Sequence, residues 1–134
     1  MSEIAVPATE EVSPAPAASL RSLRAEVLAE VGPKVARVAP DVSALAASFA
    51  LGEVWTRPGL SARDRSVATI AALVALNCQE ELRLHTLRGL KNGLSAAEIG
   101  EILTQLVPYV GFPLVVSACA RIADLVERSE AGGD

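Results

Sequence analysis

Residues 78–113 read CQEELRLHTLRGLKNGLSAAEIGEILTQLVPYVGFP, and this stretch decides the fold. It contains the only histidine of the chain, His85, within a segment that the sequence predicts to be helical over Glu80–Asn92. At about 100° per residue, Glu81, His85 and Arg88 share one polar face of that helix. Because the chain is 51% hydrophobic, an acid, an imidazole and a guanidinium on one face favour a site for chemistry.

A second helix is predicted within the same stretch. Asn92-Gly93 ends the first helix, since glycine suits the left-handed residue after a helix, and Ser95 with Glu98 forms a capping box for the next one. The apolar residues that follow keep the helical spacing and are Ile99, Ile102, Leu103, Leu106 and Val107. Pro108 is expected to end or kink this helix.

Working outward, four more helices are predicted, over residues 19–31, 40–54, 61–76 and 113–128. Gly32-Pro33 is expected to stop the first, and Ser61 to cap the third with Asp64 as its partner. No strand pattern stands out, so the fold class is all-α, a compact bundle of about six helices. The helical domain is expected over residues 18–129, between a disordered or loosely docked arm at 1–17 and a frayed tail at 130–134.

Composition excludes several classes of function. The net charge of −4 without a basic stripe argues against nucleic acid. Two cysteines at distant positions form neither a disulfide framework nor a zinc pattern, which fits a reducing cytoplasm and predicts no metal site. No signal peptide is expected, and the longest apolar run is too short to span a membrane. A chain this apolar is instead expected to form a homo-oligomer.

Further candidate site residues lie around the junction of the second and third predicted helices. Arg65 borders an apolar run and must pair or line a cavity, and a guanidinium binds a carboxylate substrate well. Glu53 is expected to face the same pocket, with Arg57 and Trp55 at its mouth. Tyr109, in the turn that ends the deciding stretch, is expected to close it.

Three runs together resemble a known family: GEVWTRPGLSARDRSVATIAALVAL (52–76), ELRLHTLRGLKNGLSAAEIGEIL (81–103) and YVGFP (109–113). Over roughly residues 40–127 the chain resembles the carboxymuconolactone decarboxylase family of the alkylhydroperoxidase D-like superfamily. The resemblance implies a small all-α protein that assembles as a trimer or hexamer. It also implies decarboxylation of a small carboxylated lactone, or a related conjugated carbonyl compound, without metal or organic cofactor.

The other branch of that superfamily contains thiol peroxidases, which carry two cysteines before the histidine. Here Cys78 matches the first cysteine, but Glu81 replaces the second and Ser66 stands at the acidic position. Cys119 lies far away in sequence. A peroxidase using Cys78 therefore stays an alternative, beside an isomerase, cyclase or dehydratase on the same fold and a non-catalytic binding protein.

The leading hypothesis makes His85 the proton-transfer group, with Glu81 and Glu53 as its catalytic partners. Four residues separate Glu81 from His85, so their side chains can meet on a helix. A carboxylate near the imidazole is expected to raise the pKa of His85 and keep its acid form available near neutral pH. Arg65, Arg57, Trp55, Cys78 and Tyr109 are the expected substrate-binding residues.

Overall fold

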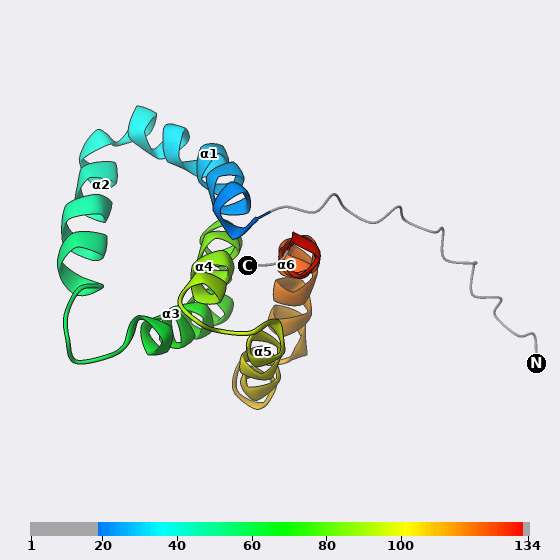
Figure 1. Cartoon of the computed structure of the whole chain (residues 1–134). Helices are drawn as coiled ribbons and strands as arrows, with labels where there is room; N and C mark the ends of the chain where they lie inside the picture. Colours follow the sequence, from blue (N-terminus) through cyan, green and yellow to red (C-terminus); the bar gives the residue numbers. More distant parts are fainter. Residues whose placement is uncertain (1–18, 133–134) are drawn as a thin grey trace, which may run out of the picture.

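The computed structural model describes residues 19–132, and every secondary-structure element in that range is helical. The elements are α1 (Leu20–Val38), α2 (Pro40–Leu45), the π-helix η1 (Ala46–Val54), α3 (Ala62–Ala75), α4 (Gln79–Lys91), α5 (Ala96–Val110) and α6 (Phe112–Gly132). The all-α prediction with six α-helices is confirmed (Figure 1). No helix in the described range is both long and apolar enough to cross a lipid bilayer. The predicted arm at 1–17 lies outside that range.

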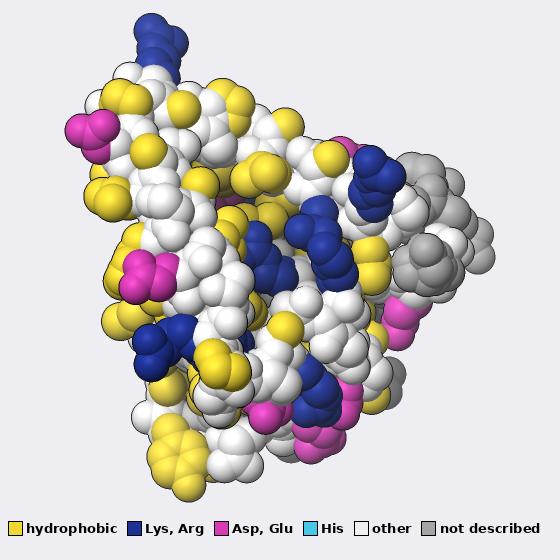
Figure 2. Space-filling model, turned by 60° about the vertical axis from the view of Figure 1, so that its left-hand side comes forward, with side chains coloured by type: hydrophobic (Ala, Val, Ile, Leu, Met, Phe, Trp, Pro, Cys, Tyr) yellow, Lys and Arg dark blue, Asp and Glu magenta, His cyan; other side chains and the backbone are white. Residues whose placement is uncertain are grey.

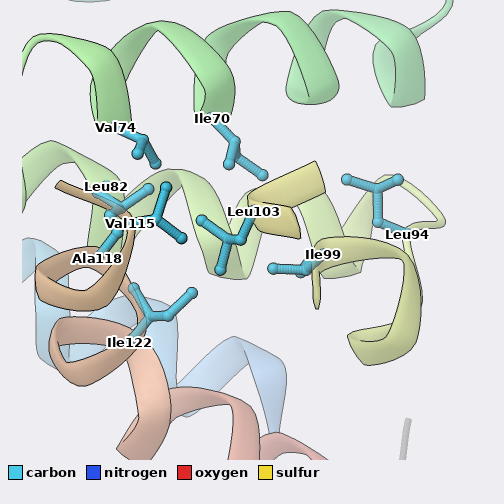
Figure 3. Close-up of a cluster of buried hydrophobic side chains, with 9 residues drawn as sticks. All are labelled: Ile70, Val74, Leu82, Leu94, Ile99, Leu103, Val115, Ala118 and Ile122. Carbon is cyan, nitrogen blue, oxygen red and sulfur yellow. The ribbon is translucent and has the colours of Figure 1, made fainter. Parts of the chain in front are cut away.

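Helix α4 is the central element, because α1, α3 and α6 all pack against it (Figure 1). Helix α5 packs against α6 and α3. Side chains from α3 to α6 and from the turn before α5 meet in the main core (Figure 3). Its buried members are Ile70, Val74, Leu82, Leu94, Ile99, Leu103, Val115, Ala118 and Ile122. The deciding stretch therefore supplies four of the nine residues of this core.

A smaller apolar cluster fastens α1 to the body of the protein. Leu23 and Val27 of α1 are buried against Leu87 of α4 and Leu125 of α6. Leu23 and Val27 are four residues apart, so they lie on one face of their helix. This packing fixes which side chains of α1 approach α4.

The predicted helix ends are largely confirmed. The Ser61 side chain accepts the Asp64 N–H at the start of α3, and Ser95 and Glu98 form both bonds of a capping box at α5. Gly93 has φ 106°, and the Leu94 N–H bonds the Gly89 carbonyl, which closes the end of α4. The sequence predicts these helix ends correctly because each cap involves residues only a few positions apart.

Pro33, expected to stop a helix, and Pro108, expected to end or kink one, both lie inside helices. Helix α1 continues through Pro33 to Val38. An interior proline costs a helix about 3 kcal/mol, and the packing of α1 against α2 and α4 opposes that cost. Helix α5 likewise continues past Pro108 and ends at Gly111, whose φ of 88° suits glycine.

Two other predicted boundaries also change. Helix α6 runs to Gly132 and so includes residues 130–132 of the segment expected to be a frayed tail, while 133–134 lie outside the described range. The predicted helix over 40–54 begins at Pro40 as expected but widens into η1 at Ala46. The Trp55 N–H still donates to the carbonyl of Ala50, five residues earlier, at 2.9 Å. The wide turn therefore persists up to Trp55.

Helices α2 and η1 form the outer limb of an arch beside α4 (Figure 1). Neither contains a buried residue. The limb instead exposes several large apolar side chains, namely Val42, Leu45, Phe49 and Leu51. Trp55, directly after η1, brings the end of the limb back to α4.

Candidate active site

The site is built around His85, in the middle of α4. The ring of Trp55 stacks on the imidazole with 5.8 Å between centroids and 19° between planes. The guanidinium carbon of Arg88 lies 5.6 Å from the centroid of the Trp55 ring, within the range of a cation–π contact. His85 and Arg88 are one helical turn apart, so α4 presents both to a residue thirty positions earlier in the chain. We call these three residues the His85 cluster.

Burial sets the charge of the histidine. Loss of solvent, and then the positive charge of Arg88, lower the pKa of His85 to about 4. At neutral pH the imidazole is therefore uncharged. Its Nδ1 atom is buried and has no hydrogen-bond partner among residues 19–132. An unpartnered buried nitrogen is costly unless a ligand or water satisfies it.

The expectation that Glu81 raises the pKa of His85 is wrong. Glu81 is exposed, and no ion pair within residues 19–132 joins it to the imidazole. The helical spacing allowed contact between the two side chains, but in the structure the side chain that stacks on the imidazole is Trp55. Burial and Arg88 therefore decide the charge of His85.

Glu81, one helical turn before His85 on α4, instead lines an apolar cavity of about 190 Å³. Its walls come from α1, α2, the start of η1 and the first turns of α4, and Leu84 is among them. The neighbouring Glu80 also lines the cavity, and it bonds Arg121 of α6 at 2.6 Å. Glu81 forms no such bond within the described residues. Of the two carboxylates at the cavity wall, Glu81 is therefore the one that can accept a hydrogen bond from a ligand.

The residues predicted around the α3 junction are more scattered. Glu53 and Arg57 are exposed, and the side chain of Glu53 bonds nothing in the described range. Arg65 is half-buried and donates from Nη2 to the carbonyl of Arg57 at 2.9 Å. Its Nε is buried without a partner. Arg65 therefore braces the loop between η1 and α3, and among these candidates only Trp55 contacts His85.

The prediction that Tyr109 closes the pocket is wrong for the single chain. Tyr109 lies in the last turn of α5 and is 77% exposed, although Val107 and Val110 of the same turn pack against the main core. Cys78 is half-buried directly before α4, with its Sγ 3.8 Å from the carbonyl of Leu76. Cys119 is exposed on α6, and both thiols are free.

Two polar features escaped the sequence reasoning. The Asn92 amide donates to the hydroxyl of the fully buried Ser66 at 3.0 Å and ties the end of α4 to α3. Arg24 of α1 lies close enough to Arg88 that its charge, after burial, lowers the pKa of Arg88. A signal for Arg24 existed, since it follows Leu20 by four residues and precedes Val27 by three, at the edge of the apolar face of α1.

Fold and site together define a small protein, helical throughout its described residues, in which one tryptophan contacts both a neutral histidine and an arginine. The chain belongs to the carboxymuconolactone decarboxylase family, whose model matches residues 40–124. The resemblance seen in the sequence is thereby confirmed. The match begins at α2, so α1 lies outside it. Within residues 19–132 no group of three or more histidine, cysteine or acidic side chains is placed to hold a metal ion.

Two curated relatives carry decarboxylase names. One is the 4-carboxymuconolactone decarboxylase of Acinetobacter baylyi, 45% identical over 65 residues that make up 48% of each chain. Another is the nitrosuccinic acid decarboxylase of Metarhizium robertsii, 33% identical over 90 residues, which are 64% of this chain and 63% of the relative. The chain thus spans between about half and just under two thirds of the curated relatives that it matches.

Proposed function

We propose that this protein is a cofactor-independent carboxy-lyase that removes carbon dioxide from a small carboxylated lactone or a related conjugated carbonyl compound. The observation that carries the proposal is the His85 cluster, which joins a buried proton-transfer group to a guanidinium. The decarboxylase names of both relatives support the reaction class. Arg88 takes the place that Arg65 had in the sequence-based hypothesis, because Arg65 is engaged by the Arg57 carbonyl.

Substrate binding would set the charge of His85. In the empty site the imidazole is neutral, because it is buried and beside a cation. A carboxylate at Arg88 offsets that positive charge, which favours the imidazolium. Binding of the anion would therefore be coupled to uptake of a proton from solvent. The acid needed for the reaction then forms only when substrate is present.

The reaction itself needs two steps. The bond between the carboxylate carbon and its neighbour breaks, carbon dioxide leaves, and the electron pair moves into the conjugated carbonyl as an enolate. Arg88 stabilises the developing negative charge electrostatically. The imidazolium of His85 then delivers its proton to carbon, which restores the neutral histidine. A water-excluding cover such as Trp55 strengthens each of these interactions.

The apolar cavity beside Glu81 is suited to the uncharged part of such a substrate. Its volume of about 190 Å³ matches a small ring better than a long chain. Glu81, at the wall, would orient that ring by accepting a hydrogen bond. Glu53 would need the limb to move inward before it could take part, since its side chain is exposed.

The test is carbon dioxide release from 4-carboxymuconolactone and nitrosuccinate, followed in the wild type and in variants of the cluster. Removing a positioned proton donor costs about 10²–10⁴ in rate, so His85→Gln should lose that much turnover. Arg88→Gln should raise KM and lower kcat. Arg37→Gln, an exposed arginine on α1, is the matched control and should act as wild type. Wild-type turnover in His85→Gln would reject the proposal.

We further propose that the protein is a homo-oligomer, with a trimer or hexamer favoured over a dimer. Large apolar side chains are exposed on the limb, and also at the α5–α6 corner, where Tyr109, Phe112 and Val116 lie. Large apolar side chains gathered on a surface often mark an interface between proteins. Light scattering should give a multiple of the 13.9 kDa chain mass, and the single-chain mass at micromolar concentration would reject the proposal.

A further inference from the structure

The tryptophan that stacks on His85 comes from a limb with few ties to the body of the protein. Helix η1 packs against α2, and α2 packs against α1. Neither limb helix contains a buried residue, and neither apolar cluster of the described residues includes a side chain from 40–60. In Figure 2, which brings this side of the molecule forward, Lys and Arg side chains lie beside hydrophobic ones in a hollow. Contacts other than a shared core must therefore fix the far end of the limb.

The local hydrogen bonds at that end orient Trp55 only relative to η1. The Trp55 N–H donates to the carbonyl of Ala50 at 2.9 Å. The hydroxyl of Thr56 lies 2.9 Å from the carbonyl oxygen of Gly52 and 3.0 Å from that of Glu53. Each of these bonds joins residues at most five positions apart. They continue the turn of η1, but they do not set the distance from Trp55 to α4.

One hydrogen bond ties the loop after Trp55 to α3. The Nη2 of Arg65 donates to the carbonyl of Arg57 at 2.9 Å, across eight positions. Within residues 19–132, no other hydrogen bond or ion pair connects residues 40–60 with α3, α4, α5 or α6. The Nε of Arg65 is buried, so the guanidinium lies against the protein. A bond from a charged donor is also stronger than one between neutral groups.

Helix α3 holds Arg65 at a fixed place relative to α4. The next residue, Ser66, is fully buried, and its hydroxyl accepts a hydrogen bond from the amide of Asn92 on α4 at 3.0 Å. Gly89 of α4 lies against the same part of α3, since a Cβ there would come within 3.1 Å of Cδ1 of Ile70. The two helices are therefore in close contact at this point, and their packing fixes where Arg65 begins.

We propose that Arg65 is a positioning residue of the candidate active site: by holding the loop at residues 55–61 against α3, it keeps Trp55 stacked on His85. The contacts form a closed path, from α4 to α3, from Arg65 to the loop, and from Trp55 back to the imidazole. Because Trp55 also lies against Arg88, the same bond helps to order both polar groups of the His85 cluster. As a statement about catalysis the proposal rests on the proposed function, but the position of Trp55 is measured without turnover.

The competing role for Arg65 is direct binding of a substrate carboxylate, as expected from the sequence. The two roles differ in the ligand-free protein. A substrate-binding arginine can be removed without disturbing Trp55 or the imidazole, whereas a positioning arginine cannot. Trp55 is the only tryptophan and His85 the only histidine of the chain, so fluorescence and NMR report on each without assignment.

Arg65→Gln removes the guanidinium and should make the fluorescence of Trp55 more accessible to quenching by acrylamide. Loss of one charged hydrogen bond shifts a conformational balance by about 10–100-fold. Because each tenfold step corresponds to one pKa unit, the pKa of His85 should rise from about 4 to about 5–6. Arg88, whose charge lowers this pKa after burial, is unchanged in the variant. Arg65→Lys keeps the charge and a donor, and should lie between wild type and Arg65→Gln in both measurements.

Arg63→Gln is the matched control. Arg63 lies two positions before Arg65 on the same helix, is also half-buried, and pairs with Glu98 of α5. The control therefore removes the same charge from α3 without touching the loop. It should leave the quenching of Trp55 and the pKa of His85 as in wild type. Circular dichroism checks that all three variants are folded.

Three results would overturn the proposal. Wild-type quenching and a wild-type pKa in Arg65→Gln would mean that Trp55 stays in place without the bond. A raised pKa with unchanged quenching would mean that the charge of Arg65 acts on the imidazole, and not the position of Trp55. Equal changes in Arg65→Gln and Arg63→Gln would trace the effect to a general loosening of α3.

Failure of this proposal and failure of the proposed function give different results. If Arg65→Gln exposes Trp55 and raises the pKa of His85 while the wild type releases no carbon dioxide from any acid tested, the positioning role stands and the lyase does not. If the wild type releases carbon dioxide and Arg65→Gln lowers that turnover without changing either signal, the lyase stands and the positioning role does not.

Discussion

The sharpest prediction concerns the charge of His85. Burial, and then the charge of Arg88, lower its pKa from the ordinary 6.5 to about 4, and Trp55 is the side chain that stacks on the imidazole. That difference of about 2.5 units corresponds to roughly 3 kcal/mol by which the folded protein disfavours the imidazolium. Trp55→Ala opens the imidazole to water and should return its pKa most of the way to 6.5. Arg88→Gln removes only the smaller cause and should raise the pKa less.

Because the chain has one histidine, a single ring proton resonance followed by NMR against pH reports this pKa without assignment. Linkage supplies an independent check. Above pH 6.5 the imidazole is neutral whether the chain is folded or unfolded. Between 6.5 and 4 only the unfolded chain takes up the proton, so the free energy of unfolding falls as the pH falls.

His85→Gln cannot titrate, so it should lack this part of the acid destabilisation. Between pH 6.5 and 4 the free energy of unfolding of the wild type, measured in urea, should therefore fall by about 3 kcal/mol more than that of His85→Gln. Protonation of Asp124 and Glu98, whose pKa values are lowered, also reduces the free energy of unfolding in acid. Both carboxylates are present in the wild type and in His85→Gln, so their contributions cancel in the difference. A wild-type pKa of 6.5 or above would refute the reasoning, because Trp55 would then not cover the imidazole in solution.

Three further results are expected. Arg83 donates two hydrogen bonds to Asp124, at 2.7 and 3.1 Å, so Asp124→Ala should lower the free energy of unfolding by about 1–3 kcal/mol in a urea titration. Glu26→Ala breaks the more exposed pair with Arg128 and should cost at most about 1 kcal/mol in the same titration. Ile70→Ala removes a fully buried side chain of the main core and should cost about 2–5 kcal/mol, measured by the urea midpoint. Cys78→Ala should keep carbon dioxide release within a few-fold of wild type, and a loss of a hundredfold or more would instead indicate chemistry at the thiol.

Local signals in the sequence determined much of the fold. The capping serines Ser61 and Ser95 and the positive-φ Gly93 placed helix ends correctly, because each acts within a few residues. The apolar spacing in residues 99–107 placed the buried face of α5. Pro33 was expected to stop α1, but the helix continues through it, because the contacts of α1 with α2 and α4 are set by the tertiary structure and are not encoded near the proline.

For the site, the sequence by itself determined that His85 and Arg88 share a face of one helix, and that the chain resembles the carboxymuconolactone decarboxylase family. Only the tertiary structure decided what surrounds them. Trp55, thirty residues earlier in the chain, stacks on the imidazole, and the charge of Arg24 on α1 acts on Arg88. A pKa depends on solvent and charges in three dimensions, which helical spacing does not contain. From the sequence, Glu81 four positions before His85 suggested a charged imidazolium. In the folded protein, burial and Arg88 keep His85 neutral.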